Sequence, residues 1–229
     1  MTQLVPDIRR VRWQPAYRIV PTRYPSVYLF DRVAELEDFD ALYALESLTN
    51  ERVRDEVGQV DLVAPQDRMV GPGSGPVMAA FTHLNPEGSR FSDGSYGVFY
   101  AAHDKDTAVA ETQYHHARFL AATRQPALQL PMRLYAVKIS AQLHDLRPLD
   151  PDGAGVHAKD NYAASQALGK QLRQQGSAGV IYRSVRHLGG ECVGLFKPKG
   201  ASQCLHAAHL LYVWNGQAFA DVYEKLGPS

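Results

Sequence analysis

The densest group of residues able to do chemistry lies between His83 and His116. It contains an arginine in a glycine-rich turn (Arg90), a tyrosine at a strand end (Tyr100) and a carboxylate early in the next helix (Glu111). Ligands often gather where a strand ends and a helix begins, because side chains and backbone donors converge there. Arg90 can bind a phosphate or carboxylate through two parallel hydrogen bonds. The same residues also fit a structural interpretation, with Arg90 as a surface loop charge, Tyr100 at the core edge and Glu111 complementing the helix dipole.

Three other signals are weaker. Cys204, His206 and His209 resemble metal ligands, but zinc needs three or four converging groups and only these three lie close in sequence, so we expect no metal. The glycine-rich stretch Gly71–Pro76 lacks the lysine and the following helix of a phosphate-binding loop, and it is interpreted as a mobile loop. Ser184 lies in no G-x-S-x-G elbow, which argues against a hydrolase triad.

The elements that must position these residues follow an irregular order. Hydrophobic patterning and turn residues predict strands at Ala16–Val20, Val77–His83, Tyr96–Ala102, Met132–Ser140, Ala178–Tyr182, Val193–Lys197 and Leu210–Trp214. They predict helices at Asp31–Val57, from Asp104 or Asp106 to about Arg124, and at Asn161–Gln175 with Asp160 or Asn161 as its cap. Strands outnumber helices without regular alternation, which favours an α+β fold with mixed or antiparallel sheets and flanking helices. We expect a single domain over residues 1–229, with 31–57 as a helical elaboration.

Composition narrows the classes of partner and compartment. The 229 residues contain 24 Lys and Arg against 24 Asp and Glu, whereas a protein that holds nucleic acid by neutralising phosphates is normally basic. Charged residues between Asp7 and Arg12 interrupt the place of a signal peptide, and no apolar run approaches the length of a spanning helix. Two cysteines, Cys192 and Cys204, are typical of reduced buried thiols. We therefore expect a cytoplasmic protein with no membrane segment and no direct nucleic-acid partner.

Several motifs, taken in order, resemble the signature of RES-domain proteins, toxins of bacterial toxin–antitoxin modules named for an Arg, a Glu and a Ser. The core motifs fall within residues 77–214, preceded by a matching opening strand. The matching segments are Tyr17–Ile19 (YRI), Gly88–Phe91 (GSRF), Gly97–Ala102 (GVFYAA), Thr107–Glu111 (TAVAE), Ala178–Arg186 (AGVIYRSVR), Gly189–Gly190 and Val193–Lys197. Ser89 and Ser92 replace a glycine and an asparagine that are common in the family, and the chain has an insertion around Gln142–His157.

The resemblance implies cleavage of NAD+ in a fold similar to diphtheria-toxin-like ADP-ribosyltransferases, with NAD+ as substrate and no metal. Glu111 would stabilise the positive charge that develops on the ribose, as carboxylates do in glycoside cleavage. Tyr100 would offer its ring to nicotinamide, and Arg90 would clamp the pyrophosphate. Ser184 would bond the nicotinamide amide or a ribose, unless it is only a strand-end cap. Arg18 is either a second phosphate contact or part of a buried ion pair.

The resemblance also implies partners. A cognate antitoxin would block the active site, and family members are often homodimers within the toxin–antitoxin complex. The ADP-ribose would pass to water, to phosphate or to a protein acceptor, and expression would arrest growth. His115 lies four residues after Glu111 and either shares its cleft or pairs with it on the surface. The alternative function is a module that binds NAD+ or another nucleotide without turning it over.

Overall fold

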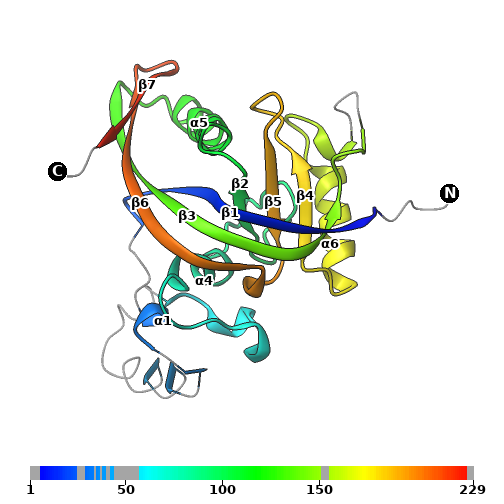
Figure 1. Ribbon diagram of the computed structural model, residues 1–229. Helices are drawn as coiled ribbons and strands as arrows, with labels where there is room; N and C mark the ends of the chain where they lie inside the picture. Colours follow the sequence, from blue (N-terminus) through cyan, green and yellow to red (C-terminus); the bar gives the residue numbers. More distant parts are fainter. Residues whose placement is uncertain are drawn as a thin grey trace.

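The computed structural model describes residues 6–24, 29–33, 35–36, 38–39, 42–43, 57–150 and 155–225, and Figure 1 labels its elements. The strands are β1 (Ile8–Pro21), β2 (Phe99–Ala102), β3 (Leu128–Asp145), β4 (Gly179–Arg183), β5 (Glu191–Leu195), β6 (Ala201–Trp214) and β7 (Phe219–Lys225). The helices are α1 (Leu29–Arg32), α4 (Gly75–Thr82), α5 (Lys105–Ala122) and α6 (Ala163–Gln174), with short 3₁₀ turns at Val60–Leu62, Pro65–Asp67, Gly155–His157 and Pro198–Gly200. Most of the helix predicted over Asp31–Val57 lies outside the described residues.

The seven strands form one sheet in the order β1-β2-β5-β4-β3-β6-β7, and β1 also pairs with β3. This extra pairing closes β1, β2, β5, β4 and β3 into a ring, while β6 and β7 extend from β3 as a curved arm (Figure 1). Every pairing is antiparallel except that of β3 with β4. The predicted α+β class with a mixed sheet and flanking helices is confirmed.

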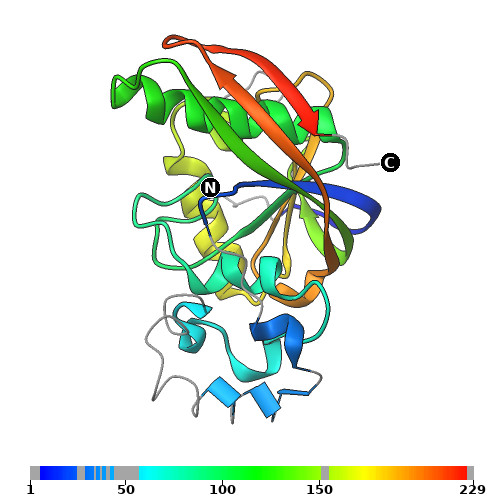
Figure 2. The same cartoon turned by 90° about the vertical axis from the view of Figure 1, so that its left-hand side faces the viewer.

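Side chains that alternate along the strands form two hydrophobic cores, one on each face of the sheet. Phe99 and Ala101 of β2 pack on the face that α1 and α4 cover, whereas Ala102 and the partly buried Tyr100 belong to the opposite face. Side chains of successive strand residues point to opposite faces, so this register decides which of them meet α5 and α6. Figure 2 shows α5 near the top of the view, well separated from α1 in the lower part of the molecule. Within the described residues, no helix is long and apolar enough to cross a membrane.

The strand predicted over Val77–His83 is wrong, because these residues form most of α4. A short apolar run does not distinguish a strand from a buried helix, and Pro76 in the first turn favours the helix. Asp31 of α1 accepts a hydrogen bond from the backbone N–H of Gly75 at 2.6 Å, which satisfies the start of the helix. This contact between distant residues carries no local sequence signal.

Three strands extend beyond the sequence prediction. β1 begins at Ile8, β3 continues to Asp145 and β6 begins at Ala201, while the edge strand β7 was not predicted. Of the residues of β7, only Phe219 and Val222 are partly buried and the rest are exposed, so the segment lacks the apolar pattern on which strand prediction depends.

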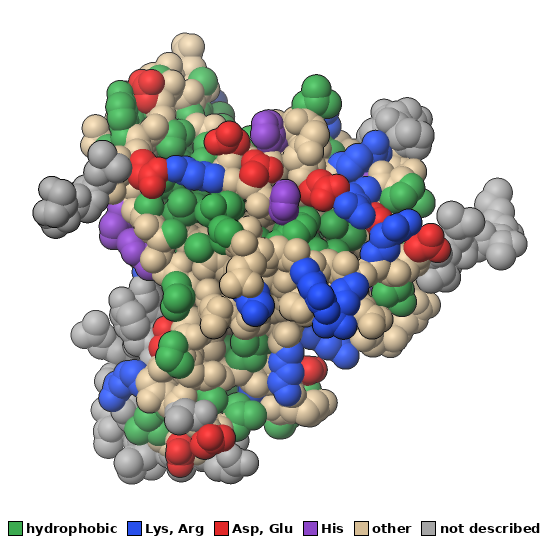
Figure 3. Space-filling view, viewed as in Figure 1, with side chains coloured by type: hydrophobic (Ala, Val, Ile, Leu, Met, Phe, Trp, Pro, Cys, Tyr) green, Lys and Arg blue, Asp and Glu red, His purple; other side chains and the backbone are tan. Residues whose placement is uncertain are grey.

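The first half of β1 has an exposed basic edge. Arg9, Arg10 and Arg12 are exposed while Val11 and Trp13 are buried. Here β1 pairs with β3 on one side, and its pairing with β2 begins only at Tyr17. Lys and Arg side chains gather on the face shown in Figure 3, which β1 crosses in the same view. Charges along an open strand edge oppose pairing with a second chain.

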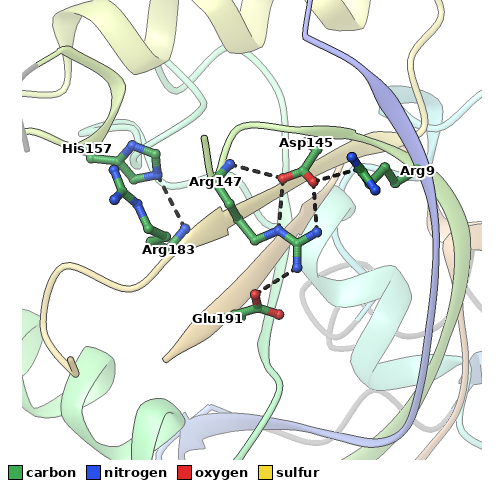
Figure 4. Close-up of polar contacts among 6 residues, drawn as sticks. All are labelled: Arg9, Asp145, Arg147, His157, Arg183 and Glu191. Atoms are coloured by element: carbon green, nitrogen blue, oxygen red, sulfur yellow. Dashed lines mark hydrogen bonds and ion pairs between the residues drawn. The ribbon is translucent and has the colours of Figure 1, made fainter. Parts of the chain in front are cut away.

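A network of ion pairs links β1, the end of β3 and the start of β5 (Figure 4). Asp145 accepts two hydrogen bonds from the Arg147 guanidinium, at 2.7 and 2.8 Å, and a third from the Arg147 backbone N–H at 3.1 Å, and it pairs with Arg9 at 3.2 Å. Arg147 also reaches Glu191 at 2.7 Å. The Asp145 side chain is only 4% exposed, and its hydrogen bonds from Arg147 lower the pKa of its carboxyl. In the same view, the backbone N–H of Arg183 donates to the ring of His157 at 3.3 Å.

Candidate active site

A cavity of about 820 Å³ lies between α5 and the strands on the face that Tyr100 shares. Its walls come from β1, β2, β4, β5, α5, the turn before β2 and the segment before α6. Arg18, Arg90, Tyr100 and Glu111 all line it, as does His115. The structure thus brings four of the five predicted site residues to one cavity, and the fifth contacts one of those four.

Arg90 is buried, with 6% of its surface exposed, so it is not a surface loop charge. One terminal nitrogen, Nη1, donates to the backbone oxygens of Val156 at 3.1 Å and Ala158 at 2.9 Å. The guanidinium stacks on the ring of Tyr162, 4.5 Å from its centroid. The other nitrogen, Nη2, is buried and has no hydrogen-bond partner within the described part of the chain. A buried donor of this kind is available to an anionic ligand.

The hydroxyl of Tyr100 is engaged by the turn that carries Arg90. It accepts a hydrogen bond from the backbone N–H of Phe91 at 2.9 Å and shares another with the hydroxyl of Ser89 at 2.9 Å. Burial raises the pKa of Tyr100 above its ordinary value, so the phenol is neutral at physiological pH. Since its hydroxyl is committed to the turn, the ring is the part of Tyr100 left for a ligand.

Helix α6 also holds the turn that carries Arg90. The side-chain amide of Gln166 donates to the backbone oxygens of Ser89 at 3.0 Å and Ser92 at 3.2 Å. Gly169 lets the two backbones meet closely, because a Cβ there would lie 2.5 Å from the backbone oxygen of Phe91. The buried ring of Phe91 anchors the turn in the core between sheet and helices. The position of Arg90 is therefore set by α6 as well as by its own turn.

Helix α5 presents a polar stripe to the cavity. Asp104 caps its first turn by accepting hydrogen bonds from the backbone N–H and the hydroxyl of Thr107, at 2.7 and 2.8 Å, as predicted from sequence. Residues spaced three or four apart on one face then line the cavity: Ala108, Glu111, Thr112, His115, Arg118, Phe119 and Ala122. A helix packed wholly on a core would place apolar side chains there. This face of α5 therefore combines polar and apolar side chains, as the walls of small-molecule cavities do.

Ser184 supports Glu111. Its hydroxyl donates to Oε1 of Glu111 at 2.6 Å and accepts from the backbone N–H groups of Arg186 at 3.1 Å and His187 at 3.0 Å. The loop is closed by a hydrogen bond from the N–H of Ser184 to the backbone oxygen of Gly190 at 2.8 Å. The hydroxyl is thus directed at the carboxylate, a contact that the sequence prediction for Ser184 did not include.

Arg18 approaches the cavity from β1. Its Nη1 donates to the backbone oxygen of Tyr100 at 3.0 Å, and its guanidinium lies over the ring of Phe99 at 4.7 Å. Burial lowers the pKa of Arg18 from its ordinary value, although a guanidinium group keeps its proton in folded proteins. Its Nε has no partner within the described residues, and no carboxylate among them forms an ion pair with it. The ion-pair interpretation of Arg18 therefore finds no support here.

His115 lines the cavity with its pKa displaced downward. Desolvation beside the cavity wall and the positive charges of Arg186 and Arg90 lower the pKa of His115 to about 4, although the side chain remains exposed to solvent. Its imidazole is therefore neutral at physiological pH. It can exchange hydrogen bonds with a ligand without adding to the positive charge of Arg90 and Arg18.

The candidate metal ligands do not converge. Cys204 is buried, and His206 and His209 stack on each other with ring centroids 4.4 Å apart. Among the described residues, no group of three or more His, Cys, Asp or Glu is arranged to hold a metal ion.

Sequence reasoning missed one prominent cavity residue, Tyr162. It holds the N-cap position of α6, where Asp160 or Asn161 was expected, and its side chain makes no capping bond. The side chain of Asn161 accepts from the backbone N–H of Ala163 at 3.0 Å instead. A tyrosine between a turn and a helix has no pattern that marks it as a ligand contact.

Three comparisons with known proteins bear on this site. A family model described as RES domain matches residues 66–215. The chain is 28% identical over 207 residues to the uncharacterized protein y4oC of Sinorhizobium fredii, covering 90% of this chain and 86% of that protein. It is also similar to the crystal structure of the M. tuberculosis MbcT–MbcA toxin–antitoxin complex, with a TM-score of 0.43, 12% identity, and coverage of 94% of this chain and 86% of that one.

Proposed function

From the premise that the chain belongs to the RES-domain family, we propose that it is the toxin of a toxin–antitoxin module and that it cleaves the nicotinamide–ribose bond of NAD+. The observation that carries the proposal is the meeting of Arg90, Tyr100 and Glu111 in one cavity, with Ser184 bonded to the glutamate. A cavity of about 820 Å³ lies within the range of small-molecule sites.

Glu111 supplies the negative charge that this reaction requires. When the bond between the ribose C1′ and the nicotinamide nitrogen breaks, the electron pair leaves with neutral nicotinamide and positive charge develops on the sugar. A fixed carboxylate stabilises that charge most in the transition state, which is where stabilisation accelerates a reaction. The hydrogen bond from Ser184 and the helical backbone of α5 hold Glu111 in place.

The two arginines suit the pyrophosphate. Arg90 and Arg18 each have a buried N–H group with no partner in the described residues, and both line the cavity. Guanidinium groups bind phosphate oxygens through charge-assisted hydrogen bonds. The ring of Tyr100 provides a flat surface for nicotinamide, because its hydroxyl is engaged by Ser89 and Phe91.

The nucleophile that completes the reaction attacks C1′, and three acceptors fit: water, phosphate or a protein side chain. The exposed α5 residues Arg118 and Phe119, which line the cavity, are available to a protein that covers it. We propose that a cognate antitoxin inhibits the chain by covering this entrance, and that expression without it arrests growth.

The test is direct. Purified chain, freed of any antitoxin, is mixed with NAD+ in buffer, with phosphate and with a cell lysate, and products are followed by mass spectrometry. We expect nicotinamide release from the wild type and its loss in Glu111→Gln. Asp221→Asn, which removes an exposed carboxylate on β7, serves as the matched control and should retain full activity. ADP-ribose, its phosphate ester or a labelled protein identifies the acceptor.

Two outcomes would contradict the proposal. Nicotinamide release that persists in a folded Glu111→Gln variant removes the role of the glutamate. Binding of NAD+ by the folded wild type without nicotinamide release under any of the three conditions supports the alternative, a nucleotide-binding module.

A further inference from the structure

Three buried hydrogen-bonding atoms in the cavity wall lack partners within the described residues: Nε of Arg18, Nη2 of Arg90 and the hydroxyl of Tyr162. Buried polar groups in folded proteins are almost always hydrogen-bonded, so unsatisfied ones gathered in a single cavity point to a ligand that completes them. Each of these three groups can donate a hydrogen bond. The ligand group that fits them is rich in acceptor oxygens and negatively charged.

Tyr162 differs from the two arginines because no motif singles it out. It comes from the segment just after the insertion around Gln142–His157, and it stands at the N-cap of α6 without capping the helix. Ser, Thr, Asp and Asn are the residues that satisfy the free N–H groups at such a position. A position that departs from this local preference, while its side chain lines a cavity, is typical of a functional role.

Tyr162 and Arg90 also form one unit. The Arg90 guanidinium stacks on the Tyr162 ring at 4.5 Å, and its Nη1 bonds the backbone oxygens of Val156 and Ala158 from the same segment. Stacking and these two hydrogen bonds fix the guanidinium plane, and Nη2 has no hydrogen-bond partner among the residues that the structure describes. The ring therefore orients the arginine, while the hydroxyl, which no described residue engages, can contact the same ligand group.

We propose that Tyr162 is a substrate-binding residue whose hydroxyl donates a hydrogen bond to a phosphate oxygen of the substrate, while its ring holds Arg90 against the same pyrophosphate. This inference rests on the function proposed above. It makes the 155–162 segment part of the substrate site and assigns it a contact at the pyrophosphate, distant from the bond that breaks.

Two substitutions separate the functions of the hydroxyl and the ring. Tyr162→Phe removes only the hydroxyl, and Tyr162→Leu also removes the surface on which Arg90 stacks. Affinity for ADP-ribose and for adenosine, which has no phosphate, is measured by calorimetry in the full chain carrying Glu111→Gln. Tyr223→Phe, an exposed tyrosine on β7, is the matched control.

We expect Tyr162→Phe to raise the Kd for ADP-ribose about tenfold, the effect of one hydrogen bond to a charged group, and to leave the Kd for adenosine unchanged. Tyr162→Leu should raise the Kd for ADP-ribose further. In the active enzyme, Tyr162→Phe should raise KM for NAD+ with kcat within about twofold, because the contact is made in the ground state and the transition state alike. Tyr223→Phe should match its parent throughout.

The outcomes are distinguishable. Nicotinamide release by the wild type, with equal ADP-ribose affinity in Tyr162→Phe and its parent, overturns the inference and leaves the proposed function standing. If Tyr162→Phe weakens the binding of adenosine as much as that of ADP-ribose, the hydroxyl does not contact the pyrophosphate, and the inference is overturned. A folded wild type that neither releases nicotinamide nor binds ADP-ribose overturns the proposed function and the inference with it.

Discussion

Removing the hydroxyl of Ser184 should slow the reaction without weakening substrate binding. In the structure that hydroxyl donates to Glu111 at 2.6 Å, and the other hydrogen bonds that it forms within the described residues come from the backbone N–H groups of Arg186 and His187. Ser184→Ala deletes a hydrogen bond to a charged group, which is worth about 1.5–3 kcal/mol. Each 1.36 kcal/mol in the barrier changes the rate tenfold. We therefore expect kcat for nicotinamide release to fall roughly 10- to 150-fold.

The assay compares kcat and KM for NAD+ in Ser184→Ala with those in Ser74→Ala. Ser74 makes the same kind of bond, from its hydroxyl to the carboxylate of Asp31 at 3.3 Å, at the start of α4 and away from the cavity lining. Its loss should affect stability and leave kcat unchanged. Because Ser184 acts through Glu111, adding Ser184→Ala to Glu111→Gln should cost little more than Glu111→Gln alone.

Two results would refute this reasoning. An unchanged kcat in Ser184→Ala would mean that the bond to Glu111 does not position the carboxylate for reaction. A raised KM and a weaker affinity for ADP-ribose, with kcat retained, would show that the hydroxyl binds substrate directly, as the sequence prediction had it.

Three further predictions follow from the packing and the charges around the site. Gly169→Ala places a Cβ 2.5 Å from the backbone oxygen of Phe91, so it should lower the free energy of unfolding by about 1–3 kcal/mol in urea and weaken ADP-ribose binding. Folding lowers the pKa of Asp145. The ionised carboxylate therefore adds its full contribution to the free energy of unfolding above about pH 3.9, the pKa of an aspartate in the unfolded chain, and this contribution is lost as the pH falls below that value. The stability gap between wild type and Asp145→Asn in urea titrations should therefore shrink from pH 7 to pH 3. With its pKa lowered to about 4, His115 stays neutral down to about pH 5.5, so the pH profile of nicotinamide release in His115→Gln should parallel that of the wild type between pH 5.5 and 8.

Each of these has a clear contradicting result. An unchanged urea midpoint in Gly169→Ala would mean that α6 shifts away from the turn without cost. An equal gap at both pH values would remove the ion pairs of Asp145 as a source of stability. An inflection near pH 6.5 that disappears in His115→Gln would show that this histidine titrates near its ordinary pKa.

The sequence was most informative where local patterns decide the structure. The motif around Arg90, the strand end at Tyr100 and the cap at Asp104 are local signals. The first two mark Arg90 and Tyr100, and the cap marks the start of the helix that carries Glu111, the third of these residues that line one cavity. The α4 segment was misassigned because the five apolar residues Val77–Phe81 fit either periodicity, and the contact that favours the helix comes from Asp31, far along the chain.

The rest of the site depends on contacts between distant segments. Ser184 was singled out by a motif, but its bond to Glu111 exists only because the loop after β4 folds against α5. Tyr162 was missed because its place beside Arg90 is decided by the path of the 155–162 segment, which has no periodicity of its own. Sequence patterns identify residue types and elements, whereas partners across the fold require the fold itself.

The closed ring of strands has a consequence for how the chain is made. β1, at Ile8–Pro21, finds its main partner in residues 132–144 of β3, and the ring is complete only when β4 and β5 are present. Pairings so distant in sequence make folding slow, because the entropy of closing a long loop is lost before the contacts form. The cavity takes walls from β1, β4 and β5, so a growing chain cannot assemble it until residues near Cys192 have been synthesised. A partner that recognises the assembled cavity therefore cannot bind it before the chain through Cys192 has left the ribosome and folded.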